Sequence, residues 1–161
     1  MIKKMFMFSF MILVFSNCDY FRNLKQKNDS ENYKPLPASV SIEFHLVKDV
    51  PEEGFSLVYQ DGTETLYLSS KPEMSNEDIS GFSRYKGVYG DDEVGILFTE
   101  KGAEKLTQVT AQNIGHKVAI LLNKELIAAP VIKQPIKGGK AALSFGNQKD
   151  EKTKKLMELF Q

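Results

Sequence analysis

The sequence predicts an α+β fold: a two-layer sandwich in which a mixed, mostly antiparallel sheet carries two helices on one face. Three observations support this class. Short segments alternate apolar and polar side chains, which is typical of strands with one buried face. Two longer segments repeat apolar side chains at helical spacing. The chain has 161 residues, of which 42% are hydrophobic, so its length favours one domain with a tail.

The first half of the predicted domain contains three strands. Residues 40–46 alternate apolar and polar side chains and form the first strand. Phe55 to Tyr59 and Thr65 to Leu68 are expected to form a hairpin, because the Asp61-Gly62 pair between them readily adopts the positive φ of a tight turn. Residues 75–78 (Ser-Asn-Glu-Asp) are suited to capping one short helical turn.

A strand and a helix follow in immediate succession. Residues 93–98 predict a strand after a turn around Gly90. Thr99 is a suitable N-cap, and apolar side chains then recur at helical spacing. Gly115 is expected to end this helix in the left-handed conformation.

The next segment predicts a second hairpin. Val118 to Leu122 is a short apolar strand, Asn123-Lys124 a two-residue turn, and Leu126 to Ile132 the return strand. Pro130 lacks a backbone N–H, so we expect its strand to lie at a sheet edge or to contain a bulge.

The C-terminal part predicts a final strand over Ala141 to Phe145 and a final helix from about Lys149 to Phe160. The strand, helix and strand between Val94 and Leu122 are expected to form a right-handed βαβ unit, which requires parallel strands. We therefore expect a ferredoxin-like arrangement around 94–160, flanked by the strands of residues 40–68.

The N-terminus predicts an export signal. Lys3 and Lys4 precede an apolar run, Met5 to Phe15, that is too short to span a bilayer. Cys18 follows after Ser16 and Asn17 and is the single cysteine of the chain. The layout resembles a bacterial lipoprotein signal, in which Cys18 is acylated after cleavage. An ordinary signal peptide or a buried apolar segment remains the alternative.

These features divide the chain into three parts. We expect a lipoprotein signal peptide over 1–17, an acylated N-terminus with a flexible tether over 18–38, and an exported domain over 39–161. Two or more acyl chains anchor a protein stably, so the protein would be lipid-anchored to a bacterial membrane and would face the periplasm or the exterior.

Composition and motifs argue against several functions. Lys and Arg total 21, as do Asp and Glu, so the basic excess of a nucleic-acid binder is missing. His45 and His116 lie far apart in sequence, which argues against a metal site and a catalytic triad. Asp91, Asp92 and Glu93 are interpreted as a solvated acidic turn. We expect no metal, no cofactor and no enzymatic activity.

Four segments together resemble a known family. They are Phe98 to Leu106, Thr110 to Ile120, Leu126 to Ile132 and Pro135 to Gly139. In order and spacing they are similar to the first large exported domain of SecD, a subunit of the bacterial protein-export translocase, including its head subdomain. The similarity covers about residues 40–160.

The resemblance implies a module that binds polypeptides or a Sec-type membrane partner in export. Such a module would lack proton coupling of its own, because transmembrane helices do not follow the domain here. The possible polypeptide-contact edge comprises Leu126, Ala128, Pro130 and Ile132. The family-motif residues are interpreted as mainly structural: Gly102, Ala103, Thr110, Gly115, Pro130, Pro135, Gly138 and Gly139. The alternative function is a structural or surface-interaction lipoprotein that binds another envelope or host protein.

Overall fold

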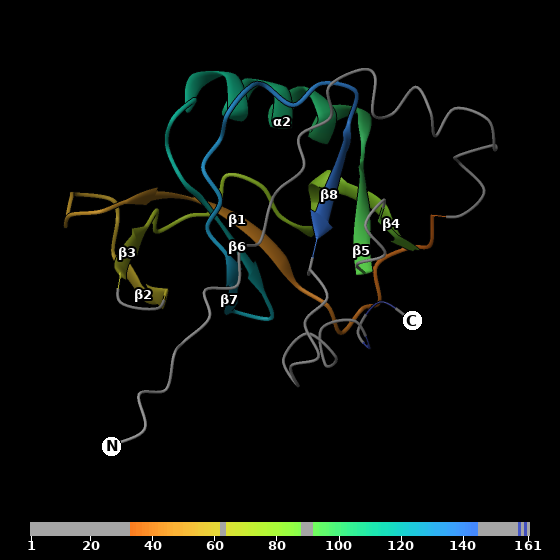
Figure 1. Cartoon of the computed structure of the whole chain (residues 1–161), viewed down its shortest axis with the longest axis horizontal. Coiled ribbons are helices and arrows are strands. Elements are labelled where there is room, and N and C mark those ends of the chain that lie inside the picture. Colours follow the sequence, from red (N-terminus) through yellow and green to blue (C-terminus); the bar gives the residue numbers. More distant parts are fainter. Residues whose placement is uncertain (1–32, 62–63, 88–91, 145–157, 159, 161) are drawn as a thin grey trace.

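The computed structural model describes residues 33–61, 64–87, 92–144, 158 and 160 (Figure 1). Eight strands, one helix and one short 3-10 turn follow each other along the chain in these residues. In order they are β1 (Ile42–Lys48), β2 (Leu57–Asp61), β3 (Glu64–Leu68), η1 (Asn76–Asp78), β4 (Ile79–Lys86), β5 (Asp92–Phe98), α2 (Glu100–Gln112), β6 (Val118–Leu122), β7 (Glu125–Ala128) and β8 (Lys140–Ser144).

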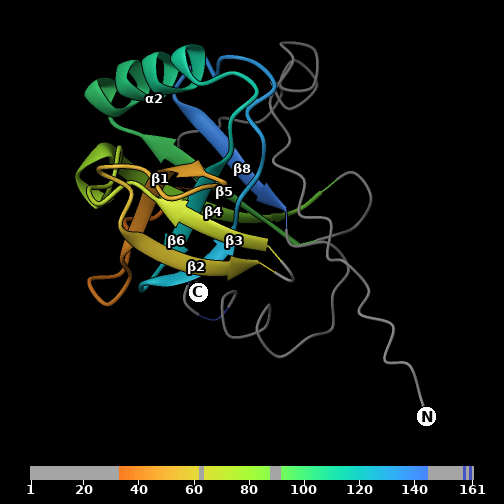
Figure 2. The ribbon, with the colours of Figure 1, turned by 90° about the vertical axis from the view of Figure 1, so that its left-hand side faces the viewer.

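The strands form two sheets. One has five strands in the order β2-β3-β1-β6-β7, and the other has three in the order β4-β5-β8. Every pairing between these described strands is antiparallel. Figures 1 and 2 show α2 lying above the strands, at one end of the molecule.

The α+β class and the mostly antiparallel pairing are confirmed, but the expected parallel βαβ unit is wrong. The strands that flank α2 belong to different sheets: β5 pairs with β4 and β8, whereas β6 pairs with β1 and β7. The chain therefore crosses from one sheet to the other through α2. This crossover replaces the ferredoxin-like connection that we expected around 94–160.

Both predicted hairpins are confirmed. Strands β2 and β3 pair from Leu57 with Leu68 to Asp61 with Glu64. In the second hairpin Asn123 and Lys124 have φ angles of 49° and 67°, the left-handed values that a two-residue turn requires. The return strand β7 lies at the sheet edge, as Pro130 predicts, but it ends at Ala128 rather than at Ile132. Pro130 therefore lies beyond the strand, and the register shift between Ile120 and Leu121 falls before it.

Helix α2 begins and ends as its sequence predicts. The Thr99 hydroxyl accepts a hydrogen bond from the Gly102 N–H at 3.0 Å, and Gly115 has a φ of +85° just beyond the helix. The second predicted helix, from about Lys149 to Phe160, lies outside the described residues except for Glu158 and Phe160. The Phe160 ring packs edge-on against Phe82, with 5.1 Å between the ring centroids.

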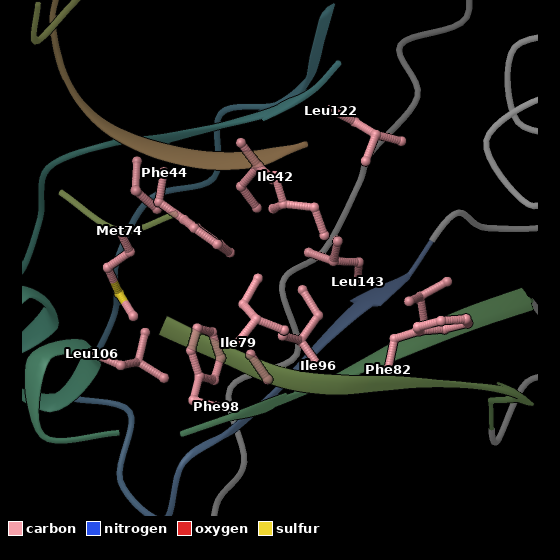
Figure 3. Packing of buried hydrophobic residues seen from close by; sticks show 14 of the residues in the cluster. Ile42, Phe44, Met74, Ile79, Phe82, Ile96, Phe98, Leu106, Leu122 and Leu143 are labelled. Carbon is pink, nitrogen blue, oxygen red and sulfur yellow. The ribbon is translucent and has the colours of Figure 1, made fainter. Parts of the chain in front are cut away.

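The main hydrophobic core lies between the two sheets rather than between helices and a single sheet. Ile42 and Phe44 of β1 point toward Ile79 and Ile96 of the three-stranded sheet (Figure 3). Leu106 of α2 closes one end of this core. Since apolar side chains of β1 and β6 alternate between the two faces of their sheet, their other face is also available for packing.

That other face holds a second apolar cluster. It consists of Val47, Leu66, Leu68, Ala119 and Leu121, with Leu57, Tyr59, Leu126 and Ala129 packed against it. Cα atoms of the two outer strands, β2 and β7, approach within 8 Å of each other. The five-stranded sheet therefore curls around this second cluster.

The tether was expected over 18–38, and its described part, residues 33–38, lies against the domain. We expected a flexible segment up to residue 38, but Lys34 forms an antiparallel bridge with Phe82, and Leu36 packs against the main core. Within the described residues, no helix is long and apolar enough to cross a bilayer.

Candidate functional site

The family-motif residues gather where α2 meets the connection between β7 and β8, residues 129–139. Gly102, in the first turn of α2, lies against the main chain of Asp78. A Cβ atom at Gly102 would overlap the Asp78 carbonyl oxygen and come within 2.9 Å of its carbon. Glycine is therefore required here by the close approach of η1 to α2.

Thr110 of α2 hydrogen-bonds the connection between β7 and β8. Its buried hydroxyl donates to the Leu106 carbonyl at 2.7 Å and accepts from the Ile136 N–H at 2.9 Å. Thr107, one turn earlier, donates to the Ile136 carbonyl at 2.8 Å. Thr107 and Thr110 thus hydrogen-bond both backbone polar groups of Ile136. Pro135 directly precedes this residue.

Gly115 and Pro130 link the exit of α2 to the same connection. The Gly115 N–H donates to the Ile132 carbonyl, and the Ile132 N–H donates to the His116 carbonyl, at 2.8 and 2.9 Å. The Pro130 carbonyl accepts from the Val118 N–H at 2.9 Å. Pro130 therefore pairs with β6 through its carbonyl group. This pairing needs no N–H from residue 130, so the proline does not weaken it.

Gly138 and Gly139 shape the entry into β8. Both have positive φ, 86° and 66°. A Cβ at Gly139 would come within 2.8 Å of the Ala103 Cβ, and the Gly139 carbonyl accepts from the Phe98 N–H at 2.9 Å. These positions shape the main chain and carry no reactive group. Their geometry agrees with the structural interpretation of the family motif.

The predicted contact edge is divided in two by the structure. Leu126 and Ala128 belong to β7, the last strand of the five-stranded sheet, and both face apolar neighbours or the protein interior. Pro130 and Ile132 follow the strand, and Ile132 is fully buried in the main core. A contact at this edge would therefore use the backbone of β7 and the exposed turn at Lys124.

A polar group surrounds the β6–β7 turn. The Lys124 ammonium donates to one carboxylate oxygen of Glu43 at 2.5 Å, and His45 Nε2 lies 3.3 Å from the other. Burial acts to raise the pKa of Glu43, but the hydrogen bonds from Lys124 and His45 outweigh it and hold that pKa below its ordinary value. The Tyr59 hydroxyl of β2 donates to the Lys124 carbonyl at 2.9 Å. The turn is thus fixed from β1 and from β2.

Lys117 ties the start of β6 to two other segments. Its ammonium donates to Glu64 at 2.6 Å and to Asp49 at 3.4 Å. The hydrogen bond to Glu64 is the main cause that raises the pKa of Lys117, against the smaller opposite effect of burial. These pairs stabilise the curled sheet rather than form a reactive site.

The two histidines and the acidic residues considered from the sequence do not come together in one site. His45 Nδ1 donates to the Ser69 carbonyl at 2.8 Å from a buried position, whereas His116 is exposed beyond α2. The solvated acidic turn is wrong for two of its three residues: Asp92 already lies in β5, and Glu93, in β5 as its strand prediction has it, is buried. Asp91 lies outside the described residues. In the part of the chain that the structure describes, no group of three His, Cys, Asp or Glu could hold a metal ion.

Two residues of η1 have a larger role than the sequence indicates. The Asn76 amide accepts from the Ile42 N–H at 2.7 Å and donates to the Val40 carbonyl at 2.6 Å, so it pairs with β1 as a strand would. Buried Asp78 accepts from the Ser75 N–H and forms an ion pair with Lys105 at 3.1 Å. The capping pattern of residues 75–78 was the available signal, and it indicated only the local turn.

A family model, the SecDF P1 head subdomain, matches residues 54–161. The chain belongs to this family. The matched range contains every element from β2 to β8 and all of the motif residues around α2.

Curated relatives agree with this assignment. The protein translocase subunit SecDF of Thermus thermophilus is 38% identical over 72 residues, which are 45% of this chain and 10% of the relative. The SecD subunit of Acidaminococcus fermentans is 29% identical over 106 residues, 65% of this chain and 25% of the relative. The chain thus spans a quarter or less of the length of these relatives.

Solved structures share the fold. A structure of a membrane component SecDF that enhances protein export superposes with a TM-score of 0.56 at 23% identity, covering 90% of this chain and 67% of that one. A crystal structure of SecDF in its super-membrane-facing form gives a TM-score of 0.55 at 24% identity, covering 83% and 19%.

Proposed function

We propose that this protein is a membrane-anchored, extracytoplasmic SecD-like module that binds polypeptides or a translocase partner during protein export. The observation that carries the proposal is the match of the SecDF P1 head subdomain to residues 54–161. The relatives are subunits of a protein translocase, and one related structure is described as enhancing protein export. Fold alone does not fix function, so the proposal needs a contact site and a direct test.

The membrane anchor in this proposal is the acylated Cys18. Its support is the sequence from Lys3 to Cys18, a charged start and an apolar run followed by the single cysteine. Metabolic labelling with a radioactive fatty acid is expected to label the natural chain and not Cys18→Ser. Equal labelling of the two proteins would contradict the anchor.

The contact in this proposal lies along β7 and the turn at Lys124. Strand β7 ends the five-stranded sheet, and an extended peptide binds a sheet edge through its backbone. Because β2 approaches β7 within 8 Å, this pairing requires β2 to move away from β7. Lys124 is 69% exposed at its side chain, beside Glu43. Lys137 is also exposed, in the connection between β7 and β8. Both positions therefore suit a photoreactive probe.

The test is photocrosslinking in cells with a photoreactive amino acid at Lys124 or Lys137, followed by mass spectrometry. We expect both positions to capture exported polypeptides or translocase subunits. The matched control is exposed Glu104 on α2, outside β7 and its turn, which is expected to capture far fewer. Recovery of one folded envelope or host protein alone would favour the surface-interaction alternative and overturn the export role.

A further inference from the structure

The two residues at the described N-terminal end lie on the outer edge of β4. The Lys34 N–H donates to the Phe82 carbonyl and the Phe82 N–H donates back to the Lys34 carbonyl, both at 2.8 Å. This reciprocal pair is an antiparallel bridge, and β4 is one of the two outer strands of its sheet. The segment thus pairs with β4 in the manner of an added strand.

Two glycines make room for this segment. A Cβ at Gly81 would come within 2.8 Å of the Lys34 carbonyl oxygen. A Cβ at Gly95 would come within 3.2 Å of the Tyr33 hydroxyl and 2.8 Å of the Ser83 hydroxyl. Because glycine weakens a strand interior, its presence here fits a place where another backbone or ring approaches closely.

The ring of Tyr33 has a defined place on the sheet. Its hydroxyl lies at Gly95, and the Lys140 ammonium lies 5.8 Å from its ring centroid. A cation at this distance over a ring is attracted by the ring's electrons, and any aromatic side chain could supply them. The site therefore combines backbone pairing at Phe82 with recognition of an aromatic ring.

Both residues are accessible to solvent. Lys34 is exposed and Tyr33 only half-buried. Among the described residues, the Lys34–Phe82 bridge and the Tyr33 ring are contacts that a second extended chain with an aromatic side chain could also make, so such a chain could compete for the same edge.

We propose that the outer edge of β4, with Gly81, Gly95 and Lys140, is a binding site for an extended polypeptide that carries an aromatic side chain. Tyr33 and Lys34 occupy this site in cis. The inference rests on the proposed function in its choice of ligand, an unfolded polypeptide, but it names a different edge from β7.

The test compares the full chain with the full-chain variant Tyr33→Ala, Lys34→Pro, which removes the ring and the donated N–H but leaves β4 unchanged. The probe is a fluorescein-labelled peptide of residues 30–38, SENYKPLPA, followed by fluorescence anisotropy. The variant is expected to bind the probe roughly tenfold or more tightly than the natural chain, because its site is unoccupied. The same peptide with alanine in place of tyrosine is the matched control and is expected to bind the variant at least about tenfold more weakly, since it lacks the ring.

A second measurement locates the probe. Amide hydrogen exchange at Phe82 is expected to be faster in the variant than in the natural chain and to slow again when the probe is bound. Equal affinity of the two proteins for the probe, or tight binding without renewed protection of Phe82, would overturn the inference. Neither result depends on the crosslinks at Lys124 and Lys137, so failure of this site and failure of the export role are distinguishable.

Discussion

Gly102 of α2 packs directly on the main-chain carbonyl of Asp78, with no room for a side chain between them. The same carbonyl accepts a hydrogen bond from the Thr99 N–H at 2.9 Å, and the Asp78 carboxylate pairs with Lys105. Helix α2 is thereby held to η1 at its N-terminus, in its first turn and again through Lys105. This contact sets the position of α2 above both sheets.

Gly102→Ala is expected to destabilise the protein by about 1–3 kcal/mol, because the added methyl group would overlap backbone that cannot easily move. Chemical denaturation followed by circular dichroism measures this loss. Glu104→Ala, exposed on the same helix, is the matched control and should change stability little. An unchanged denaturation midpoint for Gly102→Ala would contradict the close packing.

Thr110→Val should cost about 1–3 kcal/mol, since it keeps the side-chain shape but leaves the Ile136 N–H without its acceptor in a buried place. Hydrogen exchange at the Ile136 amide should become faster in this variant. The comparison variant is Thr107→Val, which removes a donor to the Ile136 carbonyl but leaves the Ile136 N–H bonded. Unaltered exchange at Ile136 in Thr110→Val would show that the threonine does not hold the connection.

Leu106→Asp is expected to cost on the order of 4 kcal/mol, because it would place a carboxylate without a partner in the main core. A thermal melt should show a large loss, whereas Gln108→Asp on the exposed side of α2 should not. A melt unchanged by Leu106→Asp would mean that the buried face of the helix is assigned wrongly.

The lowered pKa of Glu43 predicts acid sensitivity. A carboxylate with a folded pKa below its ordinary value of 4.5 stabilises the fold above that value, and this stabilisation is lost as the pH falls through the lowered pKa. Glu43→Gln should therefore show a smaller loss of stability between about pH 5 and 3 than the natural chain. Glu77→Gln, an exposed carboxylate in η1, is the control. Identical pH profiles for Glu43→Gln and the natural chain would contradict the prediction.

Much of the candidate site follows from local sequence. The cap at Thr99, the stop at Gly115 and the turn at Asn123-Lys124 each depend on a few neighbouring residues, so the sequence indicates them correctly. That the motif residues act mainly through the backbone stays a prediction, based on the backbone-shaping character of glycine, proline and alanine. The burial of Ile132 could not be predicted, because the apolar run from Leu126 to Ile132 fits a sheet edge as well as a core.

The sequence by itself determines the type of most described elements, the two hairpins and membership in the α+β class, but it does not indicate strand β4. Tertiary structure alone decides that β5 and β6 lie in separate sheets, that Asp78 is buried beneath α2, and that Tyr33 and Lys34 lie on β4. Periodicity and turn chemistry act over a few residues and leave a signal in them. The choice between strand partners depends on which apolar faces meet across the core, and those faces come from segments far apart in the chain.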